Sequence, residues 1–261
     1  MGKFTKEIFN DYRDQYRVKY ILEPGVAGKG FYKMDWLMQY GLHVEGNVLE
    51  LGGGTGGLTQ RLLKEKLVKH VTTLVFRTYE KGEATRHNRF KVFEHHSMKA
   101  YEKKHRLVIG DVHMDEYEDA KDGVKVRFDC SLYGADGGVM CLIIDIGESK
   151  TNPTEQMEYS RKKRENFEKI YHNVGRPTVV VYKELCPWDD LFLKFCDRLG
   201  LVVVRFPGSS LVSSEVYAMR GFKGPVGKPP REAVHEIGEK LLMYIDNTKQ
   251  PTILTLSLIH I

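Results

Sequence analysis

A carboxylate and an amine each follow a strongly apolar run in this chain. Asp145 comes directly after the run Val139 to Ile144, and Lys183 comes directly after the β-branched run Thr178 to Tyr182. If both runs are parallel strands of one sheet, their carboxyl ends share the edge at which such sheets bind ligands. An acid and an amine held together there can position a reacting group and transfer its proton. Each residue taken singly is more often a solvated strand end, so the pairing carries the interpretation.

Two more ionisable residues occupy the same kind of position. Asp111 follows the short apolar run Leu107 to Ile109, and Glu215 opens a predicted strand that ends at Arg220. We expect all four groups to converge on one edge of the sheet.

A glycine-rich turn, Glu50 to Leu58, joins a short apolar strand to an amphipathic helix, Leu58 to Leu67. Glycines let the backbone turn sharply and approach a ligand closely, and a helix N-terminus offers free N–H groups. The spacing also satisfies the G-x-G-x-x-G pattern of dinucleotide-binding folds. Glu50 favours S-adenosylmethionine (SAM), because a carboxylate there attracts its positive methionine end and repels a pyrophosphate. A glycine turn without a ligand is the remaining alternative.

The elements that would position these residues alternate along the chain. Short apolar runs are separated by longer amphipathic segments, which is typical of a mostly parallel sheet with helices on both faces. We therefore predict an α/β, Rossmann-like fold. Further predicted strands are 71–76 and 201–206, and the predicted helices are 29–40, 154–171, 188–199 and 231–246.

Composition limits the class of protein. The chain has 261 residues, of which 41% are hydrophobic, enough for one substantial core. We predict a single domain with a core at 26–221 and extensions at 1–25 and 222–261. No apolar run approaches the roughly 20 residues of a membrane-spanning helix, so we expect no membrane insertion. Four cysteines and scattered histidines lack metal-ligand spacing, so we expect free thiols in a reducing compartment and no metal site.

The basic residues allow a polyanionic partner without requiring one. The net charge is +5. Residues Phe4 to Tyr20 mix aromatic and basic side chains that either pack on the body of the protein or contact RNA. The run Arg161 to Arg164 is expected on the solvated face of a helix, with RNA contact as the alternative.

Five motifs in order resemble the RNA cap methyltransferase domain at the N-terminus of flavivirus polymerase proteins. The resemblance runs from about Val26 to Gly221 and implies a SAM-dependent methyltransferase fold. The motifs are Gly30-x-x-Lys33-x-x-Trp36, the turn Glu50 to Leu58, Asp145-Ile146-Gly147-Glu148-Ser149 followed by Asn152-Pro153, Tyr182-Lys183-x-Leu185-Cys186-Pro187, and Ser213-Ser214-Glu215-Val216-Tyr217.

The resemblance implies roles for individual residues. The catalytic Lys-Asp-Lys-Glu tetrad of the family falls on Lys33, Asp145, Lys183 and Glu215. An acid after the second strand holds the SAM ribose, and Glu80 and Glu83 are both candidates. The other implied SAM-binding residues are Gly28, Glu50, Gly52, Gly54, Gly56, Gly57, Leu58, Asp111, Val112 and Asp145, and the implied RNA-binding or cap-binding residues are Tyr16, Lys19 and Ser149.

The implied activity is methyl transfer from SAM to the ribose 2′-hydroxyl of the first nucleotide of capped viral RNA, and also to guanine N7. For the 2′-hydroxyl, Lys183 would act as the base. Burial and Lys33 favour its neutral form, whereas Asp145 and Glu215 oppose it. The resemblance further implies a polymerase domain downstream and a location in the host cytoplasm, at viral replication complexes.

The sequence departs from the family pattern at several positions. Leu58 stands where the family has an aromatic residue, Gly28 where it has a serine, and Ser210 where it has a basic residue. The segment 114–138 is longer than in the family and contains a predicted strand, Val124 to Cys130. These departures suggest a divergent flavi-like virus. The alternatives are an NAD(P)-dependent Rossmann oxidoreductase and a SAM-fold domain that binds RNA without catalysis.

Overall fold

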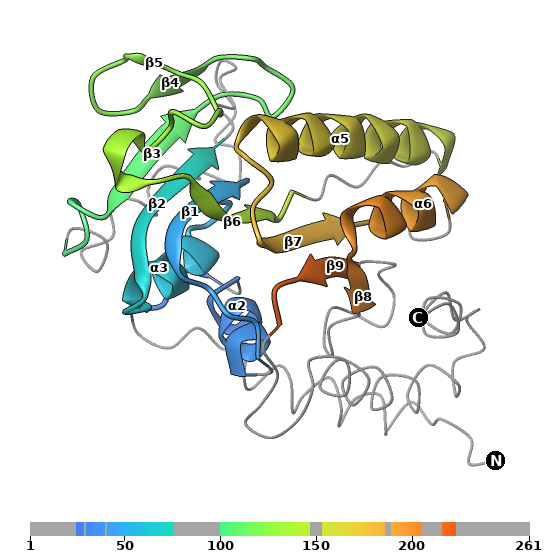
Figure 1. Cartoon of the computed structure of the whole chain (residues 1–261), viewed down its shortest axis with the longest axis horizontal. Helices are drawn as coiled ribbons and strands as arrows, with labels where there is room; N and C mark the ends of the chain where they lie inside the picture. Colours follow the sequence, from blue (N-terminus) through green and yellow to red (C-terminus); the bar gives the residue numbers. More distant parts are fainter. Residues whose placement is uncertain are drawn as a thin grey trace, which may run out of the picture.

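The computed structural model of the chain describes residues 25–28, 30–39, 41–75, 100–146, 153–185, 189–204 and 216–222 (Figure 1). The aromatic and basic segment at 4–20 and the predicted C-terminal helix at 231–246 lie outside these residues. None of the helices within the described ranges is long and apolar enough to cross a membrane.

The described strands form one nine-stranded sheet in the order β5-β4-β3-β2-β1-β6-β7-β9-β8. The strands are β1 Gly46–Leu51, β2 Val68–Val75, β3 His105–Ile109, β4 Tyr117–Asp119, β5 Lys125–Val126, β6 Val139–Ile144, β7 Val179–Glu184, β8 Val202–Val204 and β9 Val216–Arg220. The helices are α2 Gly30–Gln39, α3 Gly57–Lys64, α5 Pro153–Asn173 and α6 Asp190–Leu199, with a short 3-10 helix at Gly134–Asp136.

The predicted α/β, Rossmann-like fold is confirmed. Strands β3, β2, β1, β6 and β7 pair in parallel, and the strand order reverses between β1 and β6. The carboxyl ends of these strands therefore share one edge, with the reversal point at its centre. Strand β9 runs antiparallel to both of its neighbours, β7 and β8. This insertion departs from the 3-2-1-4-5-6 order of dinucleotide-binding sheets.

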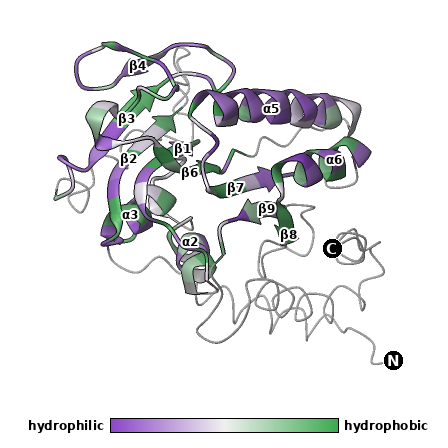
Figure 2. Cartoon of the chain, in the orientation of Figure 1, coloured by the Kyte–Doolittle hydropathy of each residue, from purple (hydrophilic) through white to green (hydrophobic). Residues whose placement is uncertain are grey.

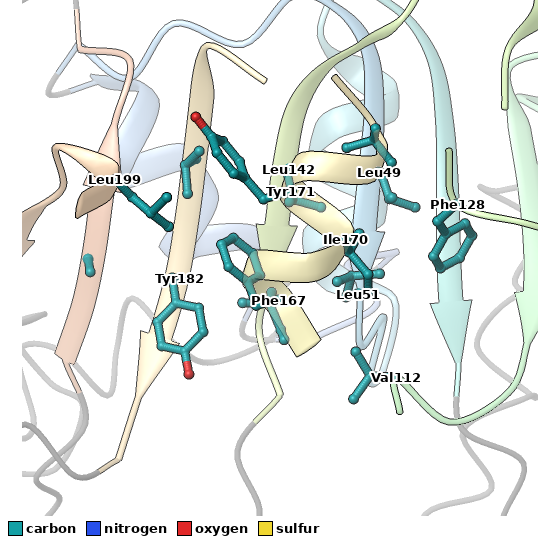
Figure 3. Close-up of a cluster of buried hydrophobic side chains, with 14 of the residues drawn as sticks. Leu49, Leu51, Val112, Phe128, Leu142, Phe167, Ile170, Tyr171, Tyr182 and Leu199 are labelled. Atoms are coloured by element: carbon teal, nitrogen blue, oxygen red, sulfur yellow. The ribbon is translucent and has the colours of Figure 1, made fainter. Parts of the chain in front are cut away.

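Two apolar clusters lie on opposite faces of the sheet, because successive side chains of a strand point to opposite faces. Helices α5 and α6 cover one face, where Leu49 and Leu142 are fully buried. Figure 3 shows Phe167 and Ile170 of α5 in this cluster. Helices α2 and α3 contribute to the other cluster, which includes Val48.

The long segment between β3 and β6 is tied to the sheet by polar contacts. Tyr133 donates its hydroxyl hydrogen to the carbonyl of Val48 at 2.5 Å and accepts the amide hydrogen of Thr72 at 3.2 Å. Asn47 donates its side-chain amide to carbonyls of this segment, among them that of Asp136 at 3.1 Å. The predicted strand Val124 to Cys130 is wrong in length, because the three-residue β4 leaves a partner for only Lys125–Val126.

The expectation that Arg161 to Arg164 forms a solvated face is also wrong in part. Figure 2 shows α5 as a largely hydrophilic helix, in agreement with its sequence. Lys163 is nevertheless 0% exposed and Arg164 is 4% exposed. Both lie on the stripe that continues through Phe167 and Ile170, which faces the sheet.

We predict that Tyr133→Phe lowers the free energy of unfolding by about 1–3 kcal/mol, because a buried amide and a buried carbonyl lose their partner. Chemical denaturation of both proteins measures the difference. Tyr101→Phe is the control, since Tyr101 packs against the α2–α3 cluster and has no hydroxyl partner among the described residues. An equal stability of Tyr133→Phe and wild type would contradict this role.

Candidate functional site

The pleat of the sheet selects which side chains meet at the carboxyl edge. Ile143 and Val181 point to the face of α2 and α3. Asp145 and Lys183 follow each of them by two residues and therefore point to the same face. Strand β9 begins at this edge, and its Tyr217 pairs with Lys183. The register thus brings an acid, an amine and a phenol together.

Four side chains at this edge form a connected series of polar contacts. Asp145 Oδ1 lies 3.2 Å from Lys183 Nζ and accepts the hydroxyl hydrogen of Tyr217 at 2.9 Å. Lys33 Nζ, from α2, donates to the Tyr217 hydroxyl at 3.0 Å. The side chains of Lys183 and Asp145 are 13% and 18% exposed, so both remain accessible at the surface. We call Lys33, Asp145, Lys183 and Tyr217 the edge cluster.

Three of the four predicted catalytic residues, Lys33, Asp145 and Lys183, are brought together in this way. Glu215 lies outside the described residues, one position before β9. Tyr217 was not predicted, although a signal for it existed. Tyr217 and Met219 are two residues apart on β9 and are buried on the same face. Tyr217 also follows the predicted catalytic residue Glu215 by two residues, so the two share a face of the predicted strand.

Helix α2 is fixed to α3, which keeps Lys33 in place. Arg61 Nε donates to Asp35 Oδ1 at 2.7 Å, and Lys64 Nζ lies 4.8 Å from the centre of the Phe31 ring. The segment before α2 is held by the fully buried Gln60, which accepts from the amide of Ala27 at 2.8 Å.

The glycine turn contains glycines that are required for two different reasons. Gly52, Gly54 and Gly56 have φ values of 91°, 53° and 80°, which side-chain-bearing residues rarely adopt. Gly57 instead permits close packing, because a Cβ there would lie 2.4 Å from the carbonyl oxygen of Gly28. A Cβ on Gly54 would meet only a backbone oxygen at 3.8 Å. Among the described residues, Gly54 therefore faces open space.

Gly28 and Gly30 pack against the glycine turn and the start of α3. A Cβ on Gly28 would lie 1.9 Å from Thr55 Oγ1, and one on Gly30 would lie 2.9 Å from the amide nitrogen of Leu58. Leu58 itself is 5% exposed and packs in the α2–α3 cluster. These contacts explain Gly28, Gly57 and Leu58 through packing, and their predicted contacts with SAM remain predictions.

Glu50 is fully buried beneath the turn. Its Oε2 accepts hydrogen bonds from Thr59 Oγ1 at 2.6 Å and Thr73 Oγ1 at 3.1 Å. Burial raises the pKa of its carboxyl group to about 7, and the charge of Asp145 adds to the shift while the two threonines oppose it. Glu50 thus lies behind the turn and presents no surface of its own.

Asp111 and Val112 lie two and three residues after the end of β3, which is three steps from β6 in the sheet. Asp111 Oδ1 accepts from the amide of His113 at 2.9 Å and thereby closes a local turn. Val112 is 6% exposed and belongs to the α5–α6 cluster.

The remaining predicted residues Tyr16, Lys19, Glu80, Glu83 and Ser149 lie outside the described residues. Within the described part of the chain, no three His, Cys, Asp or Glu side chains group as metal ligands.

The residues at this edge fit a cationic nucleoside ligand. Gly54 leaves open space at the turn, and Asp111 and Asp145 supply carboxylates at strand ends that lie three steps apart in the sheet. Glu50 Oε1 is buried with no hydrogen-bond partner among the described residues. Carboxylates attract the sulfonium and ammonium groups of SAM and repel a pyrophosphate, so this donor set fits SAM better than a dinucleotide.

Among solved structures, the crystal structure of the methyltransferase domain of bacterial CtHen1-CN is similar to this chain. The TM-score is 0.40 and the sequence identity 12%, and the similarity covers 73% of this chain and 96% of that chain. A similarity of this degree carries no argument about function. No family model matches the chain, and no curated protein matches it.

We predict that Glu50→Gln changes how stability depends on pH. The pKa of Glu50 is about 7 in the folded protein and 4.5 without burial, so its contribution is fully present below pH 4.5 and is lost as the pH rises through about 7. A glutamine does not titrate. The stability of Glu50→Gln relative to wild type should therefore rise by on the order of 3 kcal/mol between pH 4.5 and pH 8, at ~1.4 kcal/mol per pKa unit.

Urea denaturation of both proteins at a series of pH values measures this difference. Parallel stability curves for Glu50→Gln and wild type across the whole range would show that Glu50 does not titrate in the fold as described.

Proposed function

We propose that this chain is a SAM-dependent RNA methyltransferase that acts on the ribose 2′-hydroxyl next to the cap. The observation that carries the proposal is the edge cluster, in which Asp145 lies within 3.2 Å of Lys183 Nζ and 2.9 Å of the Tyr217 hydroxyl. It occupies the carboxyl edge of a sheet whose first strand leads into an open glycine turn. The motif order supports the RNA class, because Lys33, Asp145 and Lys183 fall on the tetrad of the resembling family.

Transfer to a hydroxyl requires that its proton leave as the new bond forms. SAM, when bound, supplies a methyl group on a sulfonium that departs as a neutral thioether. Lys183, in its neutral form, accepts the hydroxyl proton and becomes an ammonium ion paired with Asp145. Asp145 orients the amine throughout, since its Oδ1 faces Lys183 Nζ.

Tyr217 holds the same oxygen of Asp145 that faces Lys183, and Lys33 holds Tyr217. The Tyr217 hydroxyl donates to Asp145 Oδ1, and Lys33 Nζ donates to that hydroxyl. This arrangement fixes the carboxylate and places a second positive charge near the reacting hydroxyl.

The spacing of the strand ends supports a long ligand. Asp111 and Asp145 are separated by three strand steps, which is roughly 14 Å at about 4.8 Å per step. A ligand that touches both must be extended, as an adenosine with a methionine tail is. We propose that Gly54, Asp111 and Asp145 hold SAM along this line.

A dinucleotide oxidoreductase accounts for less of the geometry. It leaves the edge cluster without a role, and the antiparallel β9 is foreign to its strand order. A domain that binds RNA without catalysis does not require Lys33, Asp145 and Lys183 to converge. Methylation at guanine N7 needs positioning more than a base, so the cluster favours the 2′-hydroxyl.

The finer parts of the proposal rest on the resemblance alone. They are a capped viral RNA from a flavi-like virus as substrate, a polymerase domain as partner, and a location at replication complexes in the host cytoplasm.

We predict that Gly54→Ala weakens SAM binding at least tenfold, because the new methyl group enters the open space above the turn. Gly200→Ala is the matched control. Gly200 also has a positive φ, 61°, and nothing lies within 4 Å of the place that its Cβ would occupy, so the substitution carries the same backbone strain at the far end of α6. Isothermal titration calorimetry with SAM measures both. Equal SAM affinity in the two variants would remove Gly54 from the site.

We predict that Lys183→Arg loses 2′-O-methyl transfer by about 10²-fold or more, the usual scale for a general base, while SAM affinity is retained. Arginine keeps the positive charge but does not release its proton. Transfer of a radioactive methyl group to capped RNA measures the rate, and RNA already methylated at the first 2′-hydroxyl is the substrate control.

Lys194→Arg, at an exposed lysine of α6, should match the wild type. If Lys183→Arg reaches the wild-type rate under conditions where chemistry limits turnover, Lys183 is not the base.

A further inference from the structure

Helix α5 buries a lysine on the opposite face of the sheet from the edge cluster. Lys163 is 0% exposed, whereas its neighbour Lys162 is exposed. The edge cluster lies on the α2–α3 face, and α5 packs on the other face. A buried cation so near the site, with no part in the reaction described above, requires an explanation.

The ammonium group of Lys163 contacts the backbone of two neighbouring strands. Its Nζ donates to the carbonyl oxygen of Lys183 at 2.7 Å and to that of Ile146 at 3.2 Å. It also lies 4.9 Å from the centre of the Tyr182 ring. One carbonyl belongs to the proposed base itself, and the other belongs to the residue that follows Asp145.

These contacts begin where the pairing of β6 with β7 ends. The last paired residues are Ile144 and Tyr182, so Asp145 and Lys183 lie one position beyond the pairing. In the described part of both strands, no β6–β7 pairing continues past that point. Beyond this point, the ammonium group of Lys163 connects the two strands instead, because it donates to a backbone carbonyl of each.

We propose that Lys163 is a positioning residue, which sets the separation of Asp145 and Lys183 by holding the backbone of both from the opposite face of the sheet. The role in catalysis rests on the proposed function. The contacts themselves do not depend on it.

The next residue, Arg164, fixes the helix that presents Lys163. Arg164 donates to Glu184 Oε2 at 2.5 Å and also to Asp189, the residue that caps α6. Arg161 donates to the same Asp189 at 3.1 Å. Glu184 directly follows Lys183 and points to the α5 face, so β7, α5 and α6 are joined by ion pairs at this edge.

The burial of Lys163 has a cost that packing alone does not explain. Burial lowers the pKa of its ammonium group to about 8, although the charge of Glu184 opposes the shift. An apolar side chain of the same length would avoid this cost. Charged side chains are normally exposed, and a buried one is expected where a functional site requires it.

The test compares Lys163→Met with Lys162→Met in the full chain. Methionine keeps the unbranched shape of lysine and removes the ammonium group. Methyl transfer to capped RNA gives kcat and KM, calorimetry gives SAM affinity, and thermal unfolding gives Tm. We expect Lys163→Met to lower kcat by roughly 10- to 100-fold, the scale for a small misplacement of reacting groups, with KM, SAM affinity and Tm near their wild-type values. Lys162→Met should leave all four unchanged.

Two results would overturn the inference. One is an unchanged kcat in folded Lys163→Met. The other is a parallel loss of kcat, SAM affinity and Tm, which would assign Lys163 a general structural role.

A second measurement separates this inference from the proposed function. In protein labelled with ¹³C at the lysine ε-carbon, the NMR signal of Lys183, assigned with Lys183→Arg, should shift in Lys163→Met and stay in place in Lys162→Met. If wild type transfers no methyl group but the signal shifts, the proposed function fails and the positioning contact stands. If the signal does not move, the positioning inference fails whatever the activity.

Discussion

The alternation of side chains along β6 and β7 is the constraint on which the rest of the site depends. Odd-numbered residues at the ends of these strands face α2, and even-numbered residues face α5. Asp145 and Lys183 therefore meet each other on the side of α2, where Tyr217 connects Asp145 to Lys33. Glu184, one residue after Lys183, instead meets Arg164 of α5. A slip of one residue in the register would exchange the two sets. Residues 141–144 and 180–182, apolar and fully buried on both faces, hold the register against such a slip.

The sequence was informative where one physical signal dominated. The run Val139–Ile144 became β6 with unchanged bounds, because a continuous apolar segment of this length favours the interior of a sheet. The meeting of Asp145 with Lys183 followed from strand ends alone. Tyr217 was missed because a phenol carries no charge at neutral pH, although its hydroxyl can connect an acid with an amine. The structure of the insertion between β3 and β6 could not be predicted from the sequence, because its placement depends on distant contacts such as that of Tyr133 with Val48.

Charge and periodicity gave opposite signals on α5, and the prediction followed charge. Four consecutive cations suggest a solvated face. The spacing of Ser160, Lys163 and Arg164 with Phe167, however, places all of them on one stripe, and all are buried. The number of charges in a run therefore says less about exposure than the face that each residue occupies. The glycine turn shows a related ambiguity, since Gly57 is required by packing against Gly28 and Gly54 by its φ value.

Helix α2 links the two halves of the carboxyl edge mechanically. Its first residue, Gly30, packs on the start of α3 beside the turn, and one helical turn later Lys33 reaches Tyr217. A short helix moves as a rigid body, because its backbone hydrogen bonds resist bending. Any shift of the turn on ligand binding would therefore be carried through α2 to Lys33 and Asp145. The glycine turn and the edge cluster are thus connected through the ten residues of α2.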